Sequence, residues 1–198
     1  MKEIVLATGN LHKVGEISAI LAPIGLTVLP QSRFGVTSAE ETGTTFVENA
    51  IIKARNAAVQ TGLPAMADDS GIEVDALLGQ PGIYSSRYAG EEGNDQKNLE
   101  KLLEAMREVE APRRTCRYWC VMVFMRHAKD PTPVICQASW EGSLATAPRG
   151  TGGFGYDPVF LLPEGDLTVA ELSPERKNQL SHRGKALRMM FDRLRELI

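Results

Sequence analysis

Apolar residues in this chain occur in two kinds of pattern, which predict that strands and helices alternate along it. Short continuous apolar runs predict strands at residues 4–7, 26–29, 65–67, 118–125, 134–140 and 142–145, with residues 72–74 continuing as a hairpin or an edge strand. Apolar positions spaced by three and four residues predict helices that include residues 14–21, 47–58, 99–106 and 187–197. The alternation favours an α/β protein.

The boundaries of these elements indicate how they are joined. Asp95 can cap the third helix, which we expect to end near residues 111–112, and Ser173 followed by a proline can start a further helix. A turn at residues 130–133 would fold the next strand back as an antiparallel partner. We therefore expect a mixed sheet flanked by helices, in a single domain over residues 1–198 without internal repeats or linkers.

Two acidic pairs stand at the ends of the second predicted helix. Glu40 and Glu41 precede it, and Asp68 and Asp69 follow it at the carboxyl end of a predicted strand, where open α/β sheets gather ligands. Lys53 lies on the same helix, on a different face from the apolar stripe. Carboxylates near a cation suit a divalent metal and a polyphosphate. Charges at a helix end and an ordinary Asp-Asp-Ser-Gly turn would explain the same residues without chemistry.

Two glycine-containing segments could bring the backbone close to a ligand. Thr8, Gly9 and Asn10 join the first strand to the first helix, where free N–H groups and Lys13 would attract an anion. Residues 149–158 hold four glycines interleaved with two aromatic residues, whose flat faces could stack on a base. The alternatives are a plain strand-to-helix turn and a tight turn whose aromatic residues return to the core.

Basic residues come just before the last apolar stripe. Lys177 lies on the helix that follows Ser173, and Ser181, His182 and Arg183 interrupt or restart that helix. His182 and Arg183 could therefore point from a fixed helix end into a pocket. A structural role is the alternative for a single histidine.

Composition limits the classes of protein that this chain can belong to. Its 198 residues can bury a core without disulfides, and 43% hydrophobic and 24% charged residues are typical of a globular protein. A net charge of -3 argues against nucleic-acid and membrane partners. Cys116, Cys120 and Cys136 form no cluster with histidine, so we expect buried thiols in a reducing compartment. No apolar run has the length of a signal peptide or a membrane span, and we expect a cytoplasmic protein.

Five segments form a combination that is more specific than any one of them. They are residues 8–13 (Thr-Gly-Asn-Leu-His-Lys), 38–43 (Ser-Ala-Glu-Glu-Thr-Gly), 68–71 (Asp-Asp-Ser-Gly), 152–157 (Gly-Gly-Phe-Gly-Tyr-Asp) and 181–183 (Ser-His-Arg). Together, and over nearly the whole chain, they resemble the inosine/xanthosine triphosphate pyrophosphatase family, also called non-standard purine NTP pyrophosphatases. The resemblance implies a two-lobed α/β fold with a central substrate cleft, a homodimer, and Mg²⁺-dependent hydrolysis of ITP, dITP and XTP to the monophosphate and pyrophosphate. This activity would cleanse the nucleotide pool and prevent incorporation into DNA and RNA.

The resemblance also implies roles for single residues. Asp69 would be the general base for the attacking water, and Glu40 and Asp69 would hold Mg²⁺. The residues that would contact the substrate are Ser70, together with Thr8, Gly9, Asn10, Leu11, His12, Lys13, Lys53 and Lys177 at the phosphates, Phe154, Gly155, Tyr156 and Asp157 at the base and sugar, and His182 and Arg183 at the purine edge. Whether Glu41 and Asp68 also bind metal stays open at this point.

Physical chemistry supports the implied selectivity. Hypoxanthine and xanthine present an acceptor oxygen where adenine presents an amino donor. A pocket of donors such as Arg183 would therefore leave a donor facing a donor when ATP is bound, and a buried mismatch of this kind discriminates strongly.

Two other functions remain possible. The chain could be a pyrophosphatase for other modified nucleotides, or a nucleotide-sensing or RNA-binding module without chemistry, although its acidic balance counts against RNA. Metal-dependent release of pyrophosphate from ITP would separate these three functions.

Overall fold

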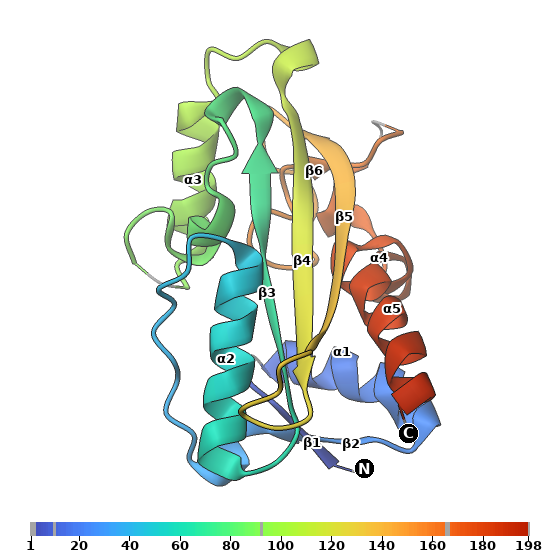
Figure 1. The fold of residues 1–198 in the computed structure, drawn as a ribbon. Coiled ribbons are helices and arrows are strands. Elements are labelled where there is room, and N and C mark those ends of the chain that lie inside the picture. The colour runs from blue at the N-terminus through green and yellow to red at the C-terminus, as the bar shows by residue number, and fades with distance from the viewer. Residues whose placement is uncertain (1–2, 10, 92, 165–166, 198) are drawn as a thin grey trace. The chain divides into compact units, whose positions relative to one another are not determined.

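A computed structural model describes residues 3–9, 11–91, 93–164 and 167–197 (Figure 1). The strands are β1 Glu3–Leu6, β2 Thr27–Pro30, β3 Ala65–Val74, β4 Thr115–Met125, β5 Val134–Leu144 and β6 Phe160–Leu161. The α-helices are α1 Leu11–Leu21, α2 Phe46–Thr61, α3 Asp95–Ala105, α4 Pro174–Leu180 and α5 His182–Leu197. A longer 3₁₀ segment covers Gly82–Arg87.

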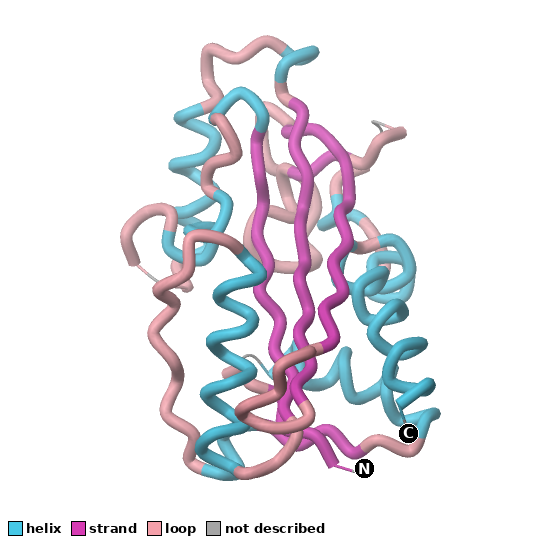
Figure 2. The backbone as a smooth tube through the Cα atoms, in the orientation of Figure 1, coloured by secondary structure: helices cyan, strands magenta, loops and turns pink. Residues whose placement is uncertain are grey.

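The strands form one six-stranded sheet in the order β2-β1-β3-β4-β5-β6. β1 is parallel to both β2 and β3, whereas β5 and β6 are antiparallel. The sheet is therefore mixed and helices flank it, as the sequence predicts. Figure 2 shows that β3, β4 and β5 are its long strands.

The chain divides into two compact units. The first unit comprises Met1–Asp69, Cys120–Ala138 and Lys185–Ile198, and the second comprises Ser70–Trp119 and Ser139–Gly184. β3, β4 and β5 each contribute residues to both units, because the boundaries fall inside these strands. Asp69 and Ser70 are consecutive residues of β3 on either side of one boundary.

Within the first unit, apolar side chains pack on both faces of the strands. One core cluster joins the strands to α1 and α5, and its members include Ile4, Leu6, Ile17, Met66, Met122, Phe124, Leu187 and Met190. The other joins the strands to α2 through Val5, Ala65, Ala67, Val121, Val123 and the helix residues Ala50, Ala54, Ala57 and Ala58. Both faces are therefore covered, which explains why these strands read as continuous apolar runs.

The second unit has a core of its own around aromatic residues. Tyr118 stacks on Phe160 with ring centroids 4.5 Å apart, and Trp140 lies 5.6 Å from the Phe160 ring. Leu99 and Leu102 of α3 belong to the same cluster. The predicted apolar face of this helix is thus a core face.

β3 corrects the predicted end of a strand at residue 67. Ala65–Val74 is one continuous strand, so Asp68 and Asp69 lie in its middle. Residues 72–74 are the end of this strand, where Glu73 forms an antiparallel bridge with Pro81 as the chain turns back. The sequence Asp-Asp-Ser-Gly suggests a turn because it is polar. Both carboxylates are instead paired with lysines, which allows an extended polar segment to be buried.

Two other boundaries differ from the prediction. Asn94, not Asp95, caps α3 by accepting a hydrogen bond from Lys97 N at 3.1 Å. The helix ends at Ala105 rather than near residue 111, and the buried guanidinium of Arg114 donates to the carbonyls of Met106 and Val109 beyond its end. These carbonyls lie outside a helix and need such donors.

The predicted third strand at residues 142–145 is the end of β5. Gly142 does not break the strand, because it lies against β6 where a Cβ atom would meet the Phe160 ring and the Leu161 carbonyl oxygen. The glycine thus marks a close approach of two strands rather than a turn.

The state of the cysteines and the character of the helices can be compared with the expected cytoplasmic location. Cys116, Cys120 and Cys136 are buried thiols, as predicted, and none of them takes part in a disulfide. In the part of the chain that the structure describes, no helix is both long enough and apolar enough to span a membrane. A cytoplasmic location stays a prediction.

Candidate active site

The alternation of β3 directs its two aspartates to opposite faces of the sheet. Successive side chains of a strand point to opposite faces, so Asp68 shares a face with Met66, and Asp69 shares a face with Ala65 and Ala67. Met66 belongs to the cluster that contains α1, whereas the two alanines belong to the cluster that contains α2. Each carboxylate therefore meets a different helix.

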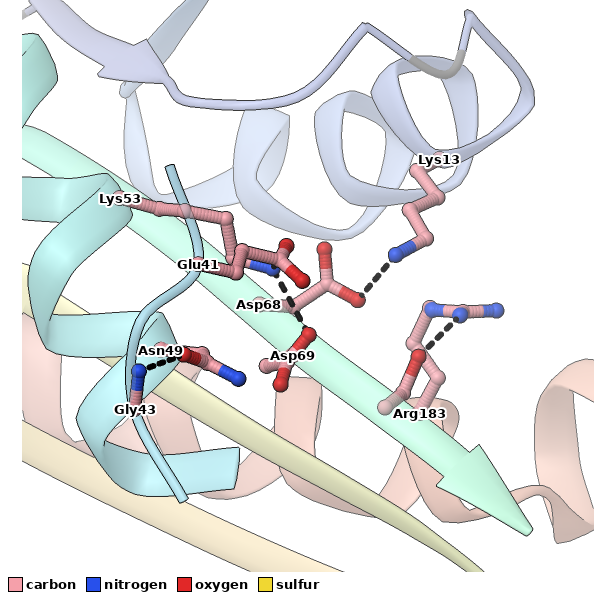
Figure 3. Close-up of polar contacts among 9 residues, drawn as sticks. Lys13, Glu41, Gly43, Asn49, Lys53, Asp68, Asp69 and Arg183 are labelled. Atoms are coloured by element: carbon pink, nitrogen blue, oxygen red, sulfur yellow. Dashed lines mark hydrogen bonds and ion pairs between the residues drawn. The ribbon is translucent and has the colours of Figure 1, made fainter. Parts of the chain in front are cut away.

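Asp68 pairs with the first of these helices. Lys13 Nζ of α1 donates to Asp68 Oδ2 at 2.7 Å (Figure 3). The Asp68 side chain is fully buried and that of Lys13 is 17% exposed. The pairing of β1 with β3 ends at Leu6 and Met66, so this contact lies just beyond the carboxyl end of a parallel strand pair. The contact thus lies at the carboxyl end of β1, whereas the predicted carboxyl end after residue 67 is wrong because β3 continues to Val74.

Asp69 pairs with the second helix. Lys53 Nζ of α2 donates to Asp69 Oδ1 at 2.8 Å and to Glu41 Oε1 at 3.0 Å. A single ammonium group thus joins the strand carboxylate to the acidic segment before α2, as Figure 3 shows. All three side chains are mostly shielded from solvent. The exposed fraction is 17% for Lys53, 11% for Asp69 and 26% for Glu41.

The surroundings of Asp69 make its carboxylate a better proton acceptor. Burial raises the pKa of Asp69, since desolvation disfavours the charged form, and the ammonium of Lys53 opposes this shift. Burial lowers the pKa of Lys53, but the charges of Asp69, Asp68 and Glu41 outweigh it and raise that pKa overall. Lys53 is therefore a permanent cation at neutral pH. A carboxylate with a raised pKa is suited to take a proton from water.

The acidic segment before α2 places Glu41, rather than Glu40, beside the other carboxylates. Glu41 is half-buried and bound to Lys53, whereas the Glu40 side chain is exposed. The role of Glu40 as a metal ligand stays a prediction. Through Lys53, the structure joins Glu41 to Asp69, and metal binding by Glu41 stays open.

α2 holds the acidic segment through its N-terminus. Thr45 and Glu48 form a capping box, and Glu48 Oε2 also accepts from Thr44 N at 2.8 Å. Gly43 N donates to Asn49 Oδ1 at 2.9 Å, and a Cβ atom on Gly43 would come within 2.7 Å of that oxygen. The segment is therefore packed tightly onto the helix.

The segment from β1 to α1 is partly described. Thr8 N donates to Leu6 O at 3.0 Å, and Gly9 is exposed with open space where a Cβ atom would lie. Asn10 lies outside the described residues, and the side chains of Leu11 and His12 are not described. Lys13 does reach the acidic residues, because its ammonium group binds Asp68.

In the second unit, Asp157 organises the glycine-rich segment. Its Oδ2 accepts from Lys177 Nζ at 2.6 Å and from Phe154 N at 2.9 Å, and its Oδ1 accepts from the hydroxyl of Tyr118 at 3.2 Å. Gly153 has a φ of +75°, and a Cβ atom there would collide with the Asp157 carboxylate. Asp157 is 3% exposed. Its carboxylate thus fixes the loop and Lys177.

The two aromatic residues of this segment have different environments. Tyr156 is buried and its hydroxyl donates to Ser85 O at 2.8 Å, as expected for an aromatic residue that returns to the core. Phe154 is 44% exposed, with Lys177 Nζ 4.4 Å and Arg183 Cζ 5.9 Å from its ring centroid. Only Phe154 therefore offers a free ring face for stacking, and it lies among cations.

The break between α4 and α5 positions His182 and Arg183. Ser181 ends α4, and its Oγ accepts from Gly184 N at 3.0 Å in the first turn of α5. The His182 ring stacks on Tyr118 at 4.7 Å, and Arg183 Nη2 donates to Ser70 Oγ at 3.1 Å. Both side chains are buried. The predicted restart of the helix is confirmed, and it holds these side chains rigidly.

The contacts of the second unit connect most of its predicted site residues. Ser70 contacts Arg183, Arg183 and Lys177 lie at the Phe154 ring, and Lys177 binds Asp157. Lys177, predicted at the phosphates, makes these contacts with the aromatic loop, and its role at the phosphates stays a prediction. The first unit similarly connects Lys13, Lys53 and the carboxylates.

Four residues of these groups have no assigned role in the sequence prediction: Glu41, Asp68, Asn49 and Tyr118. Glu41 could have been favoured over Glu40 only by knowing which way the segment turns. Asn49 lies one helical turn before Lys53, a spacing that puts two side chains on the same face and could have linked them. Tyr118 looks like any aromatic residue of a core strand, and no signal distinguishes it.

A divalent cation fits the first unit by chemistry. Carboxylate oxygens are the ligands that Mg²⁺ prefers, and Glu41 and Asp69 bring two carboxylates to the same ammonium group. Among the described residues, no three acidic, histidine or cysteine side chains already surround one point as a metal-binding group would. Because Lys53 binds both Glu41 and Asp69, these two carboxylates are the best candidates to hold the divalent cation.

The sequence matches a family model for the Ham1 family over residues 4–193. It is 62% identical to the dITP/XTP pyrophosphatase of Thioalkalivibrio sulfidiphilus (strain HL-EbGR7), over 97% of this chain and 98% of that protein. It is 56% identical to the dITP/XTP pyrophosphatase of Escherichia coli (strain K12), over 98% of this chain and 99% of that protein.

Solved structures give the same result for the fold. A HAM1 protein from Coxiella burnetii matches with a TM-score of 0.94 and 49% identity, over 99% of this chain and 100% of that chain. A nucleoside-triphosphatase, named dITP/XTP pyrophosphatase, from Mycobacterium abscessus matches with a TM-score of 0.78 and 38% identity, over 95% and 98%.

Proposed function

Because the chain belongs to the Ham1 family, we propose that it hydrolyses dITP, ITP and XTP to the nucleoside monophosphate and pyrophosphate. Relatives that match almost end to end bear the name dITP/XTP pyrophosphatase, which confirms the predicted class of enzyme, a hydrolase of nucleoside triphosphates. The single observation that carries the proposal is the buried group of Asp69, Lys53 and Glu41, in which a basic carboxylate lies beside a fixed cation.

In the proposed reaction, Asp69 acts as the general base. A water oxygen forms a bond to the α-phosphorus, the bond from that phosphorus to the bridging oxygen breaks, and pyrophosphate leaves with the electron pair. Asp69 accepts the proton of the water, for which its raised pKa is suited. Lys53 holds the Asp69 carboxylate in place through Oδ1.

The cations of the first unit neutralise the substrate. Lys13 and Lys53 are the ammonium groups of this unit that lie at the carboxylates, and a triphosphate brings several negative charges that repel both water and base. Glu40, Glu41 and Asp69 would hold Mg²⁺, which supplies further charge neutralisation when bound.

Phe154 and Arg183 are the groups that we assign to the purine. Phe154 offers the exposed ring for stacking, and Arg183 is a buried donor whose orientation Ser70 fixes. A donor favours the 6-oxo group of hypoxanthine and xanthine over the 6-amino group of adenine, because a buried donor that faces another donor stays unsatisfied. Asp157 and Lys177 support this surface by holding the Phe154 backbone and ring.

A panel of nucleoside triphosphates tests the proposal. The purified chain with Mg²⁺ is given dITP, ITP, XTP, ATP and dGTP, and pyrophosphate and phosphate are measured separately. We expect pyrophosphate from the first three at kcat/KM values at least about tenfold above those for ATP. Release of phosphate instead, or preference for ATP, would contradict the proposed function.

Some expectations go beyond this test. A homodimer, a cytoplasmic location and a role in cleansing the nucleotide pool follow from the family resemblance and stay predictions. Static light scattering measures the first directly.

A further inference from the structure

Asn49 is a buried polar residue without a role in the proposed reaction. It lies in the first turns of α2 and is completely buried. An asparagine in such a place must satisfy one acceptor and two donor positions, because burial of an unpaired amide is costly.

One end of the Asn49 amide is fixed by the acidic segment. Asn49 Oδ1 accepts the hydrogen bond from Gly43 N at 2.9 Å. A backbone N–H can only donate, so the group facing Gly43 must be the oxygen, and the nitrogen must face the other way. The orientation of this amide thus follows from chemistry.

The other end of the amide points toward Asp69, as Figure 3 shows. Lys53 lies four residues after Asn49 on the same face of α2, and its ammonium occupies Asp69 Oδ1. The two remaining atoms, Asn49 Nδ2 and Asp69 Oδ2, are both buried, and neither has a hydrogen-bond partner among the described residues. A donor and an acceptor are therefore presented together without a direct bond between them.

An oxygen atom that carries hydrogen satisfies both groups at once. It accepts a hydrogen bond from Asn49 Nδ2 and donates one to Asp69 Oδ2. Water has this capacity, and after these two bonds it keeps a second lone pair and a second hydrogen. Two fixed contacts of this kind define where the water lies and which way its remaining lone pair points.

We propose that Asn49 and Asp69 together hold the water that attacks the α-phosphorus. The inference rests on the proposed function and adds a second residue to the proposed handling of water. Asn49 donates to the water oxygen, Asp69 Oδ2 takes the proton, and the free lone pair forms the bond to phosphorus while pyrophosphate leaves. Asn49 also ties this site to the acidic segment, because its Oδ1 holds Gly43.

Two substitutions at Asn49 separate water binding from support of the segment. Asn49→Asp keeps an oxygen for Gly43 N but replaces the donor that faces Asp69 with an acceptor, whereas Asn49→Ala removes both ends. We expect kcat for dITP to fall at least about tenfold in both variants, with KM changed by less than about threefold in Asn49→Asp. If Asn49 only supports the segment, Asn49→Asp should keep a kcat close to that of the unchanged protein, which would overturn the inference.

Asn98 provides the matched control. It is also a buried helical asparagine, but both of its ends bind backbone, with Oδ1 accepting from Ala89 N and Nδ2 donating to Ser86 O. Asn98→Asp should lower the melting temperature while leaving kcat for dITP within about twofold. A loss of kcat equal to that in Asn49→Asp would show that such losses only report damage to the fold.

A crystal structure of the unchanged chain decides the matter if the variants do not fold. With Mg²⁺ and a dITP analogue whose α,β-bridge is a methylene group, we expect one oxygen atom within hydrogen-bonding distance of both Asn49 Nδ2 and Asp69 Oδ2. An Asn49 amide bonded elsewhere would overturn the inference. The activity of the unchanged protein on dITP tests the proposed function separately, since an inactive protein would refute that function whatever the variants do.

Discussion

At the residue scale, the site depends on which charges are paired before a substrate arrives. Asp69 is held through one oxygen by Lys53, while its other oxygen is buried and available. Asp68 lies fully buried against Lys13 on the opposite face of β3. The two neighbouring aspartates therefore have different surroundings, and we propose different roles for them, one reactive and one that orients a lysine.

We expect Asp69→Asn to reduce kcat for dITP by about 10²- to 10⁴-fold while the protein stays folded, because an amide does not accept the proton of water. Steady-state pyrophosphate release and circular dichroism check this. Asp68→Asn is the comparison and should lose less, since it only weakens the hold on Lys13. Equal losses in the two variants would show that the difference in roles is wrong.

Arg183→Ala tests selectivity among purines. We expect kcat/KM for ITP and XTP to fall by about one to two decades, because a charge-assisted hydrogen bond is worth roughly 1.5 to 3 kcal/mol, while the already poor use of ATP changes little. Phe154→Ala should instead weaken all three substrates similarly through lost stacking. If Arg183→Ala weakens all three equally, Arg183 serves the phosphates or the fold.

At the scale of elements, the sequence predicted helices better than the limits of strands. The stripe of α2 and the restart at Ser181 could be foreseen, because helical spacing and capping residues are local signals. The course of β3 through Asp68 and Asp69 could not, since it depends on lysines that come from two other helices. The stacking of Tyr118 on His182 likewise joins residues far apart in sequence, and no local pattern encodes it.

The turn between β4 and β5 is a local element with a measurable electrostatic contribution. Asp130 is 3% exposed and accepts hydrogen bonds from Arg126 N, Nε and Nη2 and from Thr132 N. The bonds from Arg126 hold the pKa of the Asp130 carboxyl well below its ordinary range. We expect Asp130→Asn to lower the free energy of unfolding at pH 7 by about 2 kcal/mol.

The same turn predicts how this deficit varies with pH. The unfolded chain protonates Asp130 near pH 4, but the folded protein does so only at much lower pH, so the ionised carboxylate stabilises the fold above about pH 4 and loses this effect as the pH falls further. The difference between the two proteins should thus shrink below pH 4. Urea unfolding at pH 7, 5, 4 and 3 measures it, and a constant difference would exclude the carboxylate as its source.

At the scale of the whole molecule, three strands are continuous through both compact units. Cys116 of the second unit and Cys120 of the first lie four residues apart on β4, and Cys136 lies on β5. Burial raises the pKa of Cys116 to about 12 and also raises that of Cys136. Neither thiol should react in the folded protein, because the thiolate is the reactive form.

We therefore expect all three cysteines to become reactive in a single transition as urea is increased. Alkylation with iodoacetamide at pH 8, followed by mass spectrometry of each cysteine peptide, gives three unfolding curves. Coincident midpoints are expected because β4 and β5 have residues in both units. When such a strand loses its structure in one unit, its hydrogen bonds to neighbouring strands in the other unit are weakened as well. A lower midpoint for Cys120 and Cys136 than for Cys116 would show that the units unfold independently.

Because side chains alternate along β3, the proposed chemistry also depends on the number of residues that precede the two aspartates in this strand. Inserting one residue between Ala65 and Asp68 would exchange the faces of the two aspartates, so that each carboxylate would approach the other's lysine. Inserting two would restore the faces but shift both carboxylates by roughly 7 Å along the strand. Neither change alters any residue of the site, yet we expect both to abolish hydrolysis. Length between Ala65 and Asp68 is therefore as tightly constrained as the identity of the aspartates themselves.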